Sequence, residues 1–323
     1  MLFVTNRFPK QSLRTRKGRK FNFDLKNNAP SNSVFFCEAG QDGDHVEIGS
    51  LDFLQRLKDS QCRQILLFVH GFNNLPDFIF EMTAELQKLC DKKKKNEVLV
   101  VPLIWPCDND LGIVSDYWDD QKSADQSGYS FARVLEKFLA WRNSEANEPE
   151  VAPCLKRINL LAHSMGNRVL RQTLASWNKY DLAAGVPLIF RNTFMVAADV
   201  VNETLHEGHS GELISHASRN VVVYYASDDL ALRASKAANL KNKIASRRLG
   251  HTGPENIRRT PRNVFQVDCD DINTQYDTPT GHNYFRFGKR SGQPGAVFNH
   301  IYQCIESGRV FPDDPDQRSS VLE

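Results

Sequence analysis

The most constraining stretch of this chain runs from Arg157 to Leu170, Arg-Ile-Asn-Leu-Leu-Ala-His-Ser-Met-Gly-Asn-Arg-Val-Leu. Its apolar segment, from Ile158 to Ala162, is long enough for a buried strand. The apolar residues between Val169 and Leu174 fit one face of a helix. The apolar run breaks at His163-Ser164-Met165-Gly166 and resumes at Val169. We therefore predict a sharp strand-to-helix turn with the hydroxyl of Ser164 at its tip.

Small residues flank this serine. Ala162 and Gly166 stand two positions on either side of Ser164, and they let the strand and the helix approach closely. The pattern is the nucleophile elbow G-x-S-x-G, with Ala162 in place of the first glycine. A helix that begins here points backbone N–H groups towards the place where an oxyanion would form. The structural alternative is that Ser164 only caps the helix.

A second buried strand, Ile65 to Val69, runs directly into His70-Gly71-Phe72. In a fold with a nucleophile elbow, the loop after such a strand supplies one oxyanion-binding N–H group, and the residue after the serine supplies the other. Gly71 lets the backbone turn and come close to a substrate. We expect His70, Gly71 and His163 to lie near the substrate. The alternative for His70-Gly71 is a tight turn with a hydrogen-bonded histidine.

The rest of the chain alternates apolar strand-like runs with amphipathic segments. Strands are predicted at 2–4, 34–36, 46–48, 97–105, 187–198, 219–226 and 263–268, and helices at 51–57, 77–90, 127–141 and 296–305. This alternation predicts an α/β fold with a mostly parallel central sheet and helices on both faces. We expect one domain over 1–311, with a loop at 106–119, an insertion at 227–262 and a polar, frayed tail at 312–323.

Several polar residues fall at or just after strand ends, where ligands bind in parallel sheets. A serine nucleophile needs a histidine to take its proton and a carboxylate to orient that histidine. The order Ser164, Asp229, His282 follows the nucleophile, acid, histidine order of this motif class. Asp199 is an alternative acid, and His251 an alternative base. The structural alternative for these aspartates is helix capping.

Charge and cysteine content limit the other function classes. The formal net charge is +2, which gives no reason to expect a nucleic-acid partner. Met1 to Arg7 has no apolar region of the kind found in signal peptides, and no apolar run reaches the length of a membrane span. The 7 cysteines lack metal-ligand spacing, so we expect reduced thiols in a cytoplasmic protein.

The insertion at 227–262 is strongly basic, with nine arginines and lysines: Arg233, Lys236, Lys241, Lys243, Arg247, Arg248, Arg258, Arg259 and Arg262. It is either a solvated helix and loop or a lid or rim that attracts anionic acyl esters by steering. Two further function classes stay open. The same residues would serve acyl transfer or thioester cleavage, and a catalytically silent binding module would keep the fold without the chemistry.

The chain resembles a known family on motifs that follow one another along nearly its whole length: Phe3-Val-Thr-Asn-Arg7, Phe68-Val-His-Gly-Phe-Asn-Asn74, Trp105-Pro106, Leu160-Leu-Ala-His-Ser-Met-Gly-Asn-Arg-Val169, Tyr224-Tyr-Ala-Ser-Asp-Asp-Leu-Ala-Leu232 and Gly281-His-Asn-Tyr284. These motifs are similar to those of the bacterial α/β-hydrolase family catalogued as a domain of unknown function, DUF900.

The resemblance implies a serine hydrolase of the lipase and esterase type, with a small-molecule acyl ester as substrate and without a metal or organic cofactor. It implies Ser164, Asp229 and His282 as a catalytic triad, and the N–H groups of Phe72 and Met165 as oxyanion donors. The family often has a proline before the aspartate where this chain has alanine before Asp199. This departure leaves the role of Asp199 open.

Overall fold

The computed structural model describes residues 1–40, 43–108, 113–146, 152, 154–180, 185–240, 247–314 and 316–323. The strands are β1 (Leu2–Arg7), β2 (Arg19–Lys20), β3 (Pro30–Ala39), β4 (His45–Glu47), β5 (Gln64–Val69), β6 (Val98–Ile104), β7 (Arg157–His163), β8 (Phe190–Val196), β9 (Ser218–Tyr225), β10 (Val264–Asp268) and β11 (Ser319–Val321). The helices are α1 (Ser50–Asp59), α2 (Pro76–Lys93), α3 (Ile113–Ala146), α4 (Gly166–Tyr180), α5 (Glu212–His216), α6 (Leu230–Leu240), α7 (Leu249–Thr252), α8 (Asp270–Tyr276) and α9 (Ala296–Ser307), with a 3₁₀ turn η1 at Ile257–Arg259.

These strands form one 11-stranded sheet in the order β11-β10-β9-β8-β7-β5-β6-β1-β3-β4-β2. From β11 to β1 every neighbouring pair is parallel. Only β3, β4 and β2, at one edge, pair antiparallel. The predicted mostly parallel sheet is confirmed. Parallel neighbours need crossover connections, and helices provide them here.

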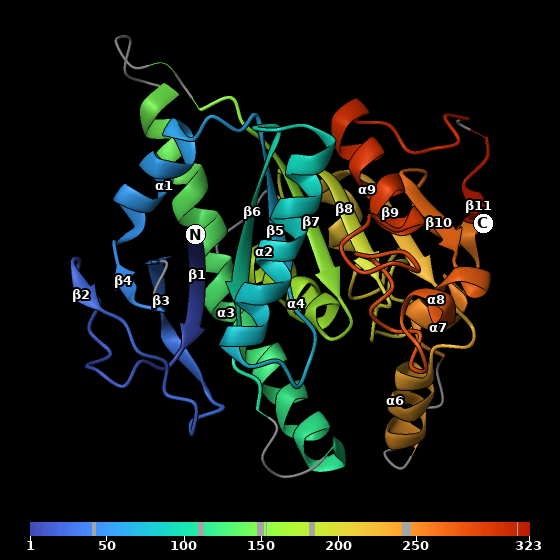
Figure 1. The fold of residues 1–323 in the computed structure, drawn as a ribbon, viewed down its shortest axis with the longest axis horizontal. Helices are drawn as coiled ribbons and strands as arrows, with labels where there is room; N and C mark the ends of the chain where they lie inside the picture. Colours follow the sequence, from blue (N-terminus) through green and yellow to red (C-terminus); the bar gives the residue numbers. More distant parts are fainter. Residues whose placement is uncertain are drawn as a thin grey trace.

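Helices cover both faces of the sheet (Figure 1), and each face has its own apolar core. In β5, Ile65 and Val69 face one core while Leu66 and Phe68 face the other, as the two-residue repeat of a strand requires. The first core takes in residues of α1, α3, α4 and α5. The second takes in residues of α2, α8 and α9. Burial on both faces explains why the central strands read as continuous apolar runs.

The helix predicted at 127–141 begins earlier than the sequence indicates. The loop expected over 106–119 is helical from Ile113 onwards, because α3 extends over Ile113–Ala146; residues 109–112 lie outside the described part of the chain. Polar side chains in this segment obscure the helical repeat of apolar residues, so the sequence does not show the helix. Tertiary contacts stabilise the helix instead. Asp120 is fully buried in this added segment and hydrogen-bonds the backbone of Asn73.

The prediction of a frayed tail is wrong for the last residues of the chain. Ser319, Ser320 and Val321 form β11, which pairs in parallel with β10. The amide of Leu322 donates to the carbonyl oxygen of Asp268, and its side chain packs on the apolar core. The edge of β10 offers backbone partners to any extended segment, so pairing here depends little on side-chain type.

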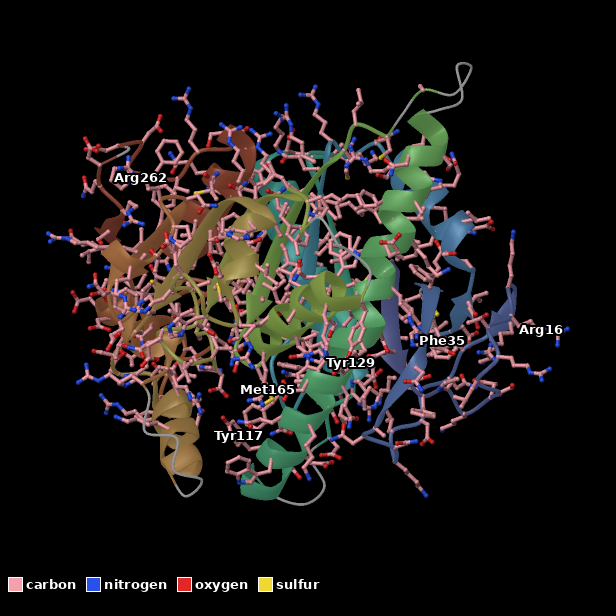
Figure 2. All side chains as sticks on the ribbon, turned by 180° about the vertical axis from the view of Figure 1, so that it is seen from behind. Arg16, Phe35, Tyr117, Tyr129, Met165 and Arg262 are labelled. Atoms are coloured by element: carbon pink, nitrogen blue, oxygen red, sulfur yellow. The ribbon has the colours of Figure 1, made fainter. Side chains whose placement is uncertain are left out.

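The carboxyl ends of the parallel strands meet at one end of the molecule, where α6 and the first part of α3 project beyond the sheet (Figure 1). Figure 2 shows Tyr117 and Met165 at this end, far from Arg16 and Arg262. The helix α6 opens the predicted insertion, while Lys241 and Lys243 lie outside the described residues. Among the described residues, no helix combines the length and apolar character needed to cross a membrane.

Candidate active site

The turn between β7 and α4 places Ser164 at a strained backbone position. Ser164 has φ 53°, a left-handed conformation that costs a non-glycine residue about 1–3 kcal/mol. Its amide donates to the carbonyl oxygen of Val196 at 3.0 Å. The side-chain amide of Asn167 donates to the carbonyl oxygens of Ala162 and Ser164, at 2.9 and 3.1 Å. Neighbouring strand and helix atoms thus hold the serine at the tip of a sharp turn.

Gly166 is required for this turn because no side chain fits there. A Cβ atom at this position would lie 2.5 Å from the carbonyl oxygen of Val69 and 2.6 Å from that of His70. Real Cβ atoms do not approach backbone oxygens so closely, so a side chain here would have to displace the end of β5. The second small residue of the predicted elbow therefore lets α4 start directly against β5.

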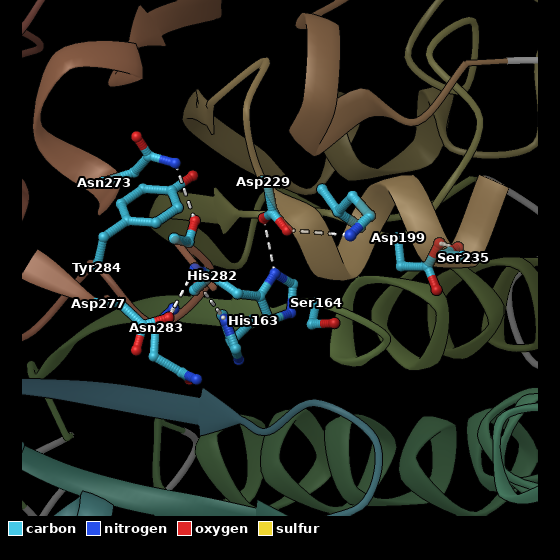
Figure 3. Close-up of polar contacts among 12 residues, drawn as sticks. His163, Ser164, Asp199, Asp229, Ser235, Asn273, Asp277, His282, Asn283 and Tyr284 are labelled. Carbon is cyan, nitrogen blue, oxygen red and sulfur yellow. Dashed lines mark hydrogen bonds and ion pairs between the residues drawn. The ribbon is translucent and has the colours of Figure 1, made fainter. Parts of the chain in front are cut away.

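His282 and Asp229 form a buried hydrogen-bonded pair beside Ser164 (Figure 3). The Nδ1 atom of His282 lies 2.7 Å from Oδ2 of Asp229, and the Asp229 carboxylate is fully buried. Figure 3 shows the imidazole between the carboxylate and the serine side chain. A carboxylate on Nδ1 fixes the tautomer that leaves Nε2 free to accept a proton. In the described structure no hydrogen bond joins Ser164 Oγ to His282, a contact that often tightens only when substrate binds.

The charge of Asp229 sets the proton affinity of His282. Burial lowers the pKa of His282, but the charge and hydrogen bond of Asp229, helped by Asp199 and Asp277, outweigh burial and raise the pKa above its ordinary value. The protonated imidazole is therefore stabilised in this site. A base that gains a proton during a reaction benefits from such an arrangement.

Asp229 has a second, structural role as the N-terminal cap of α6. Its Oδ1 atom accepts the amide of Leu232 at 3.0 Å, which satisfies one of the unpaired N–H groups of the first turn. The same carboxylate thus caps the helix through Oδ1 and bonds His282 through Oδ2. The neighbouring Asp228 accepts from the side chain of Asn273 at 2.5 Å instead.

The loop that carries His282 is held by Asp277, which sequence reasoning missed. Its Oδ2 atom accepts the amides of His282 and Asn283 at 2.7 and 2.8 Å. Gly281, which has φ 65°, makes the turn between Asp277 and His282. An aspartate four residues before a Gly-His pair is a signal for such a side-chain-to-backbone turn, and it was available in the sequence.

The loop after β5 brings Gly71 against Ser164. A Cβ atom on Gly71 would lie 3.0 Å from Ser164 Cβ and 3.2 Å from His163 Nδ1, so only glycine fits without a shift. Within the described residues, the amides of Phe72 and Met165 donate to no backbone carbonyl and to no side chain. Two N–H groups thus remain available close to Ser164.

Asp120 anchors the same loop from α3. It accepts the amide of Asn73 at 2.9 Å through Oδ2, and the Asn28 side chain at 2.8 Å and the amide of Asp108 at 3.3 Å through Oδ1. Burial raises the pKa of Asp120 to about 7, although these hydrogen bonds favour the charged form. One carboxylate therefore ties the loop after β5 to two other loops.

His70 and His163, which the sequence places near the substrate, lie behind the pocket wall. The His70 ring stacks on Trp105 at 5.1 Å, and its Nε2 accepts the Trp105 amide at 3.1 Å. Burial lowers the pKa of His70 to about 3. His163 Nε2 donates to the carbonyl oxygen of His282 at 3.0 Å. Neither ring is among the residues that line the pocket. Both rings instead form hydrogen bonds with backbone groups.

A cavity of about 500 Å³ opens over Ser164 and His282. Its wall is mostly apolar, with side chains from α6 and Phe72, and it also contains Tyr117, Asp199 and Ser235. Asp199, the alternative acid, contacts no histidine in the described structure. Its oxygens lie 2.9 Å from Tyr117 Oη and 2.6 Å from Ser235 Oγ. His251, the alternative base, is not part of the lining.

No group of three or more metal-ligating side chains occurs among the residues that the structure describes. The parallel sheet, the serine at a strained strand-to-helix turn, and the histidine and aspartate after the last two long strands define an α/β-hydrolase. The chain belongs to the family described as alpha/beta hydrolase of unknown function, DUF900, whose model matches residues 49–286. The resemblance noted from the motifs is confirmed. Comparison with curated proteins finds no relative that matches the chain.

Proposed function

We propose that this protein is a serine hydrolase that cleaves a carboxylic ester or thioester through an acyl-enzyme. His282 Nε2 takes the proton of Ser164 Oγ, and Oγ attacks the acyl carbon. The tetrahedral intermediate collapses as His282 protonates the departing alcohol or thiol. Water, deprotonated by the same nitrogen, then attacks the acyl carbon, and the bond from that carbon to Ser164 Oγ breaks as His282 returns the proton to Oγ, which releases the acid. Asp229 orients the imidazole and stabilises its charge.

The observation that carries this proposal is the buried pair of His282 and Asp229 at 2.7 Å, which lies beside a serine held at φ 53° in the wall of one pocket. The amides of Phe72 and Met165 supply the oxyanion hole. Each such donor is worth about 3 kcal/mol of barrier in an acyl-transfer site. A glycine could adopt the left-handed conformation of Ser164 without strain. The presence of a strained serine at this position therefore favours a functional reason for its hydroxyl.

Burst kinetics with p-nitrophenyl acetate test the proposal. With this activated ester, an acyl-enzyme mechanism whose deacylation is slower than its acylation releases nitrophenol rapidly in proportion to enzyme before a slower steady rate. Ser164→Ala should abolish both phases. Ser60→Ala is the matched control, because Ser60 is a helix-capping serine whose hydroxyl bonds the carbonyl oxygen of Leu57.

Retention of hydrolysis by folded Ser164→Ala protein would overturn the assignment of the nucleophile. A wild-type protein that shows no turnover of short oxygen esters and thioesters would instead favour a binding module. Acyl transfer to an acceptor other than water would appear as a burst whose second phase accelerates when an alcohol or amine is added.

A further inference from the structure

A polar cluster interrupts the apolar wall of the pocket near the nucleophile. It consists of Tyr117 from α3, Asp199 from the segment after β8, and Ser235 from α6, and all three line the pocket together with Ser164. Figure 3 shows Asp199 and Ser235 on the side of Ser164 that faces away from Asp277. The amide of Asp199 donates to the carbonyl oxygen of Ser164 at 3.2 Å. The backbone of Asp199 is therefore held next to the backbone of Ser164.

A buried arginine balances the carboxylate from behind. Arg248 is only 4% exposed, and its Nε lies 3.1 Å from Asp199 Oδ1. The arginine does not line the pocket. A buried ion pair of this kind contributes little or nothing to stability compared with apolar residues of the same size. Its presence in the wall of a reaction pocket therefore points to a role in binding.

The hydrogen bonds leave one acceptor on the carboxylate. Oδ1 accepts from Ser235 and faces Arg248, whereas Oδ2 accepts only from Tyr117 among the described residues. A carboxylate oxygen can accept two hydrogen bonds. Burial and the nearby charge of Asp199 raise the pKa of Tyr117 to about 12, so the phenol remains a neutral donor. Oδ2 can thus accept one more hydrogen bond, from the pocket.

We propose that Asp199 determines specificity by accepting a hydrogen bond from a hydroxyl group of the substrate, so that the enzyme prefers neutral hydroxylated esters to their deoxygenated isosteres. The inference rests on the proposed hydrolase function and names its substrate class. Because Arg248 already balances Asp199, the pocket needs no cationic substrate. An anionic group would face the carboxylate without a partner, since the described residues that line the pocket include no lysine or arginine.

This assignment replaces the expectation of anionic substrates raised by the basic insertion. Arg233, which the structure does describe, is exposed and donates to the carbonyl oxygen of Ser227. The insertion instead contributes apolar side chains of α6 and the hydroxyl of Ser235 to the pocket. Among the described residues of this segment, the side chains that line the pocket are therefore uncharged.

Three isosteric ester pairs test the proposal with an indicator assay for released acid: ethyl lactate against ethyl isobutyrate, ethyl 3-hydroxybutyrate against ethyl 3-methylbutyrate, and 2-hydroxyethyl butyrate against propyl butyrate. In each pair a hydroxyl group replaces a methyl group. We expect wild-type kcat/KM to favour the hydroxylated member of at least one pair by about tenfold or more, the effect of one hydrogen bond to a charged group.

Asp199→Asn should reduce that ratio to about one, because asparagine has no charge and presents a donor NH2 group in place of one of the two acceptor oxygens. The double variant Asp199→Asn/Arg248→Gln removes both charges, so the test can still be made if the single variant unfolds. Thermal melting shows whether each variant is folded. Thr280→Val is the matched control. It removes a different hydroxyl from the same pocket and should leave the ratio unchanged.

Wild-type ratios of one or less in all three pairs, with hydrolysis that depends on Ser164, would overturn the proposal while leaving the hydrolase function intact. A preference that survives in both Asp199 variants would overturn it as well. No hydrolysis of any ester, together with no fluorophosphonate adduct on Ser164, would instead refute the proposed function. The proposed substrate class would then be refuted as well.

Discussion

Replacing Asp229 by asparagine separates the two roles of this residue. Asparagine caps helices about as well as aspartate, so α6 should keep its cap at Leu232. The negative charge 2.7 Å from His282 Nδ1 is lost. We therefore expect the free energy of unfolding to change little and the reactivity of Ser164 to fall steeply. Asp229→Ala should lose the cap as well, at a further cost of about 1 kcal/mol.

The size of the effect follows from the geometry. When His282 takes the serine proton, an imidazolium forms with its charge centre about 4 Å from that of the carboxylate. At an effective dielectric constant of about 20 the attraction is about 4 kcal/mol. Each 1.36 kcal/mol of barrier is a factor of ten in rate, so loss of the charge should slow acylation about 10³-fold. An asparagine that orients the wrong imidazole tautomer would add to the loss.

The rate of modification by a fluorophosphonate measures this effect without knowledge of the substrate. The matched control is Asp228→Asn, since Asp228 is adjacent but bonds Asn273 instead of His282. Its labelling rate should stay within about threefold of the wild type, the usual range of a surface substitution. Labelling of Asp229→Asn at the wild-type rate would refute the reasoning. If Asp199→Asn showed the large loss and Asp229→Asn did not, Asp199 would be the acid.

Three further predictions follow from the site. Because the pKa of His282 is raised above 6.5 and only the neutral base can accept the serine proton, the labelling rate should rise with pH to a plateau with a midpoint above 6.5; a midpoint below 6.5 would contradict the assigned cause. Gly71→Ala should lower kcat about 100-fold, because its Cβ would lie 3.0 Å from that of Ser164 and displace it; unchanged kcat would show that the loop yields freely. Asp277→Ala should lower kcat more than it raises KM, because two amides of the His282 loop lose their acceptor; Asp277→Asn, which keeps one acceptor oxygen, should recover part of kcat, and an equal loss in both would exclude the positioning role.

The sequence allowed the sheet and the order of the site residues to be predicted because both depend on local patterns. Runs such as Ile65 to Val69 are strands buried on both faces, and their apolar continuity is visible without a structure. The turn at Ser164 needs a small residue at Gly166 because two backbone oxygens lie there. The placement of Asp229 and His282 after strands follows from the parallel topology.

Contacts between distant segments could not be predicted in this way. Asp199, Tyr117, Ser235 and Arg248 come from four elements, and no periodicity links them. The early start of α3 depends on the burial of Asp120 beneath the loop after β5. β11 forms because β10 offers an open edge, not because Ser319 to Val321 favour a strand. In each case the contact depends on a residue that is remote in sequence, and the secondary-structure propensity of the local segment carries no information about such contacts.

The central claim is that Ser164 is an activated nucleophile, and intact-mass analysis after fluorophosphonate treatment, followed by peptide mapping, tests it most directly. The account predicts a single adduct on wild-type protein, located on Ser164, absent from Ser164→Ala and His282→Ala, and retained by Ser60→Ala. No adduct on folded wild-type protein, or an adduct at another residue that persists in Ser164→Ala, would contradict it.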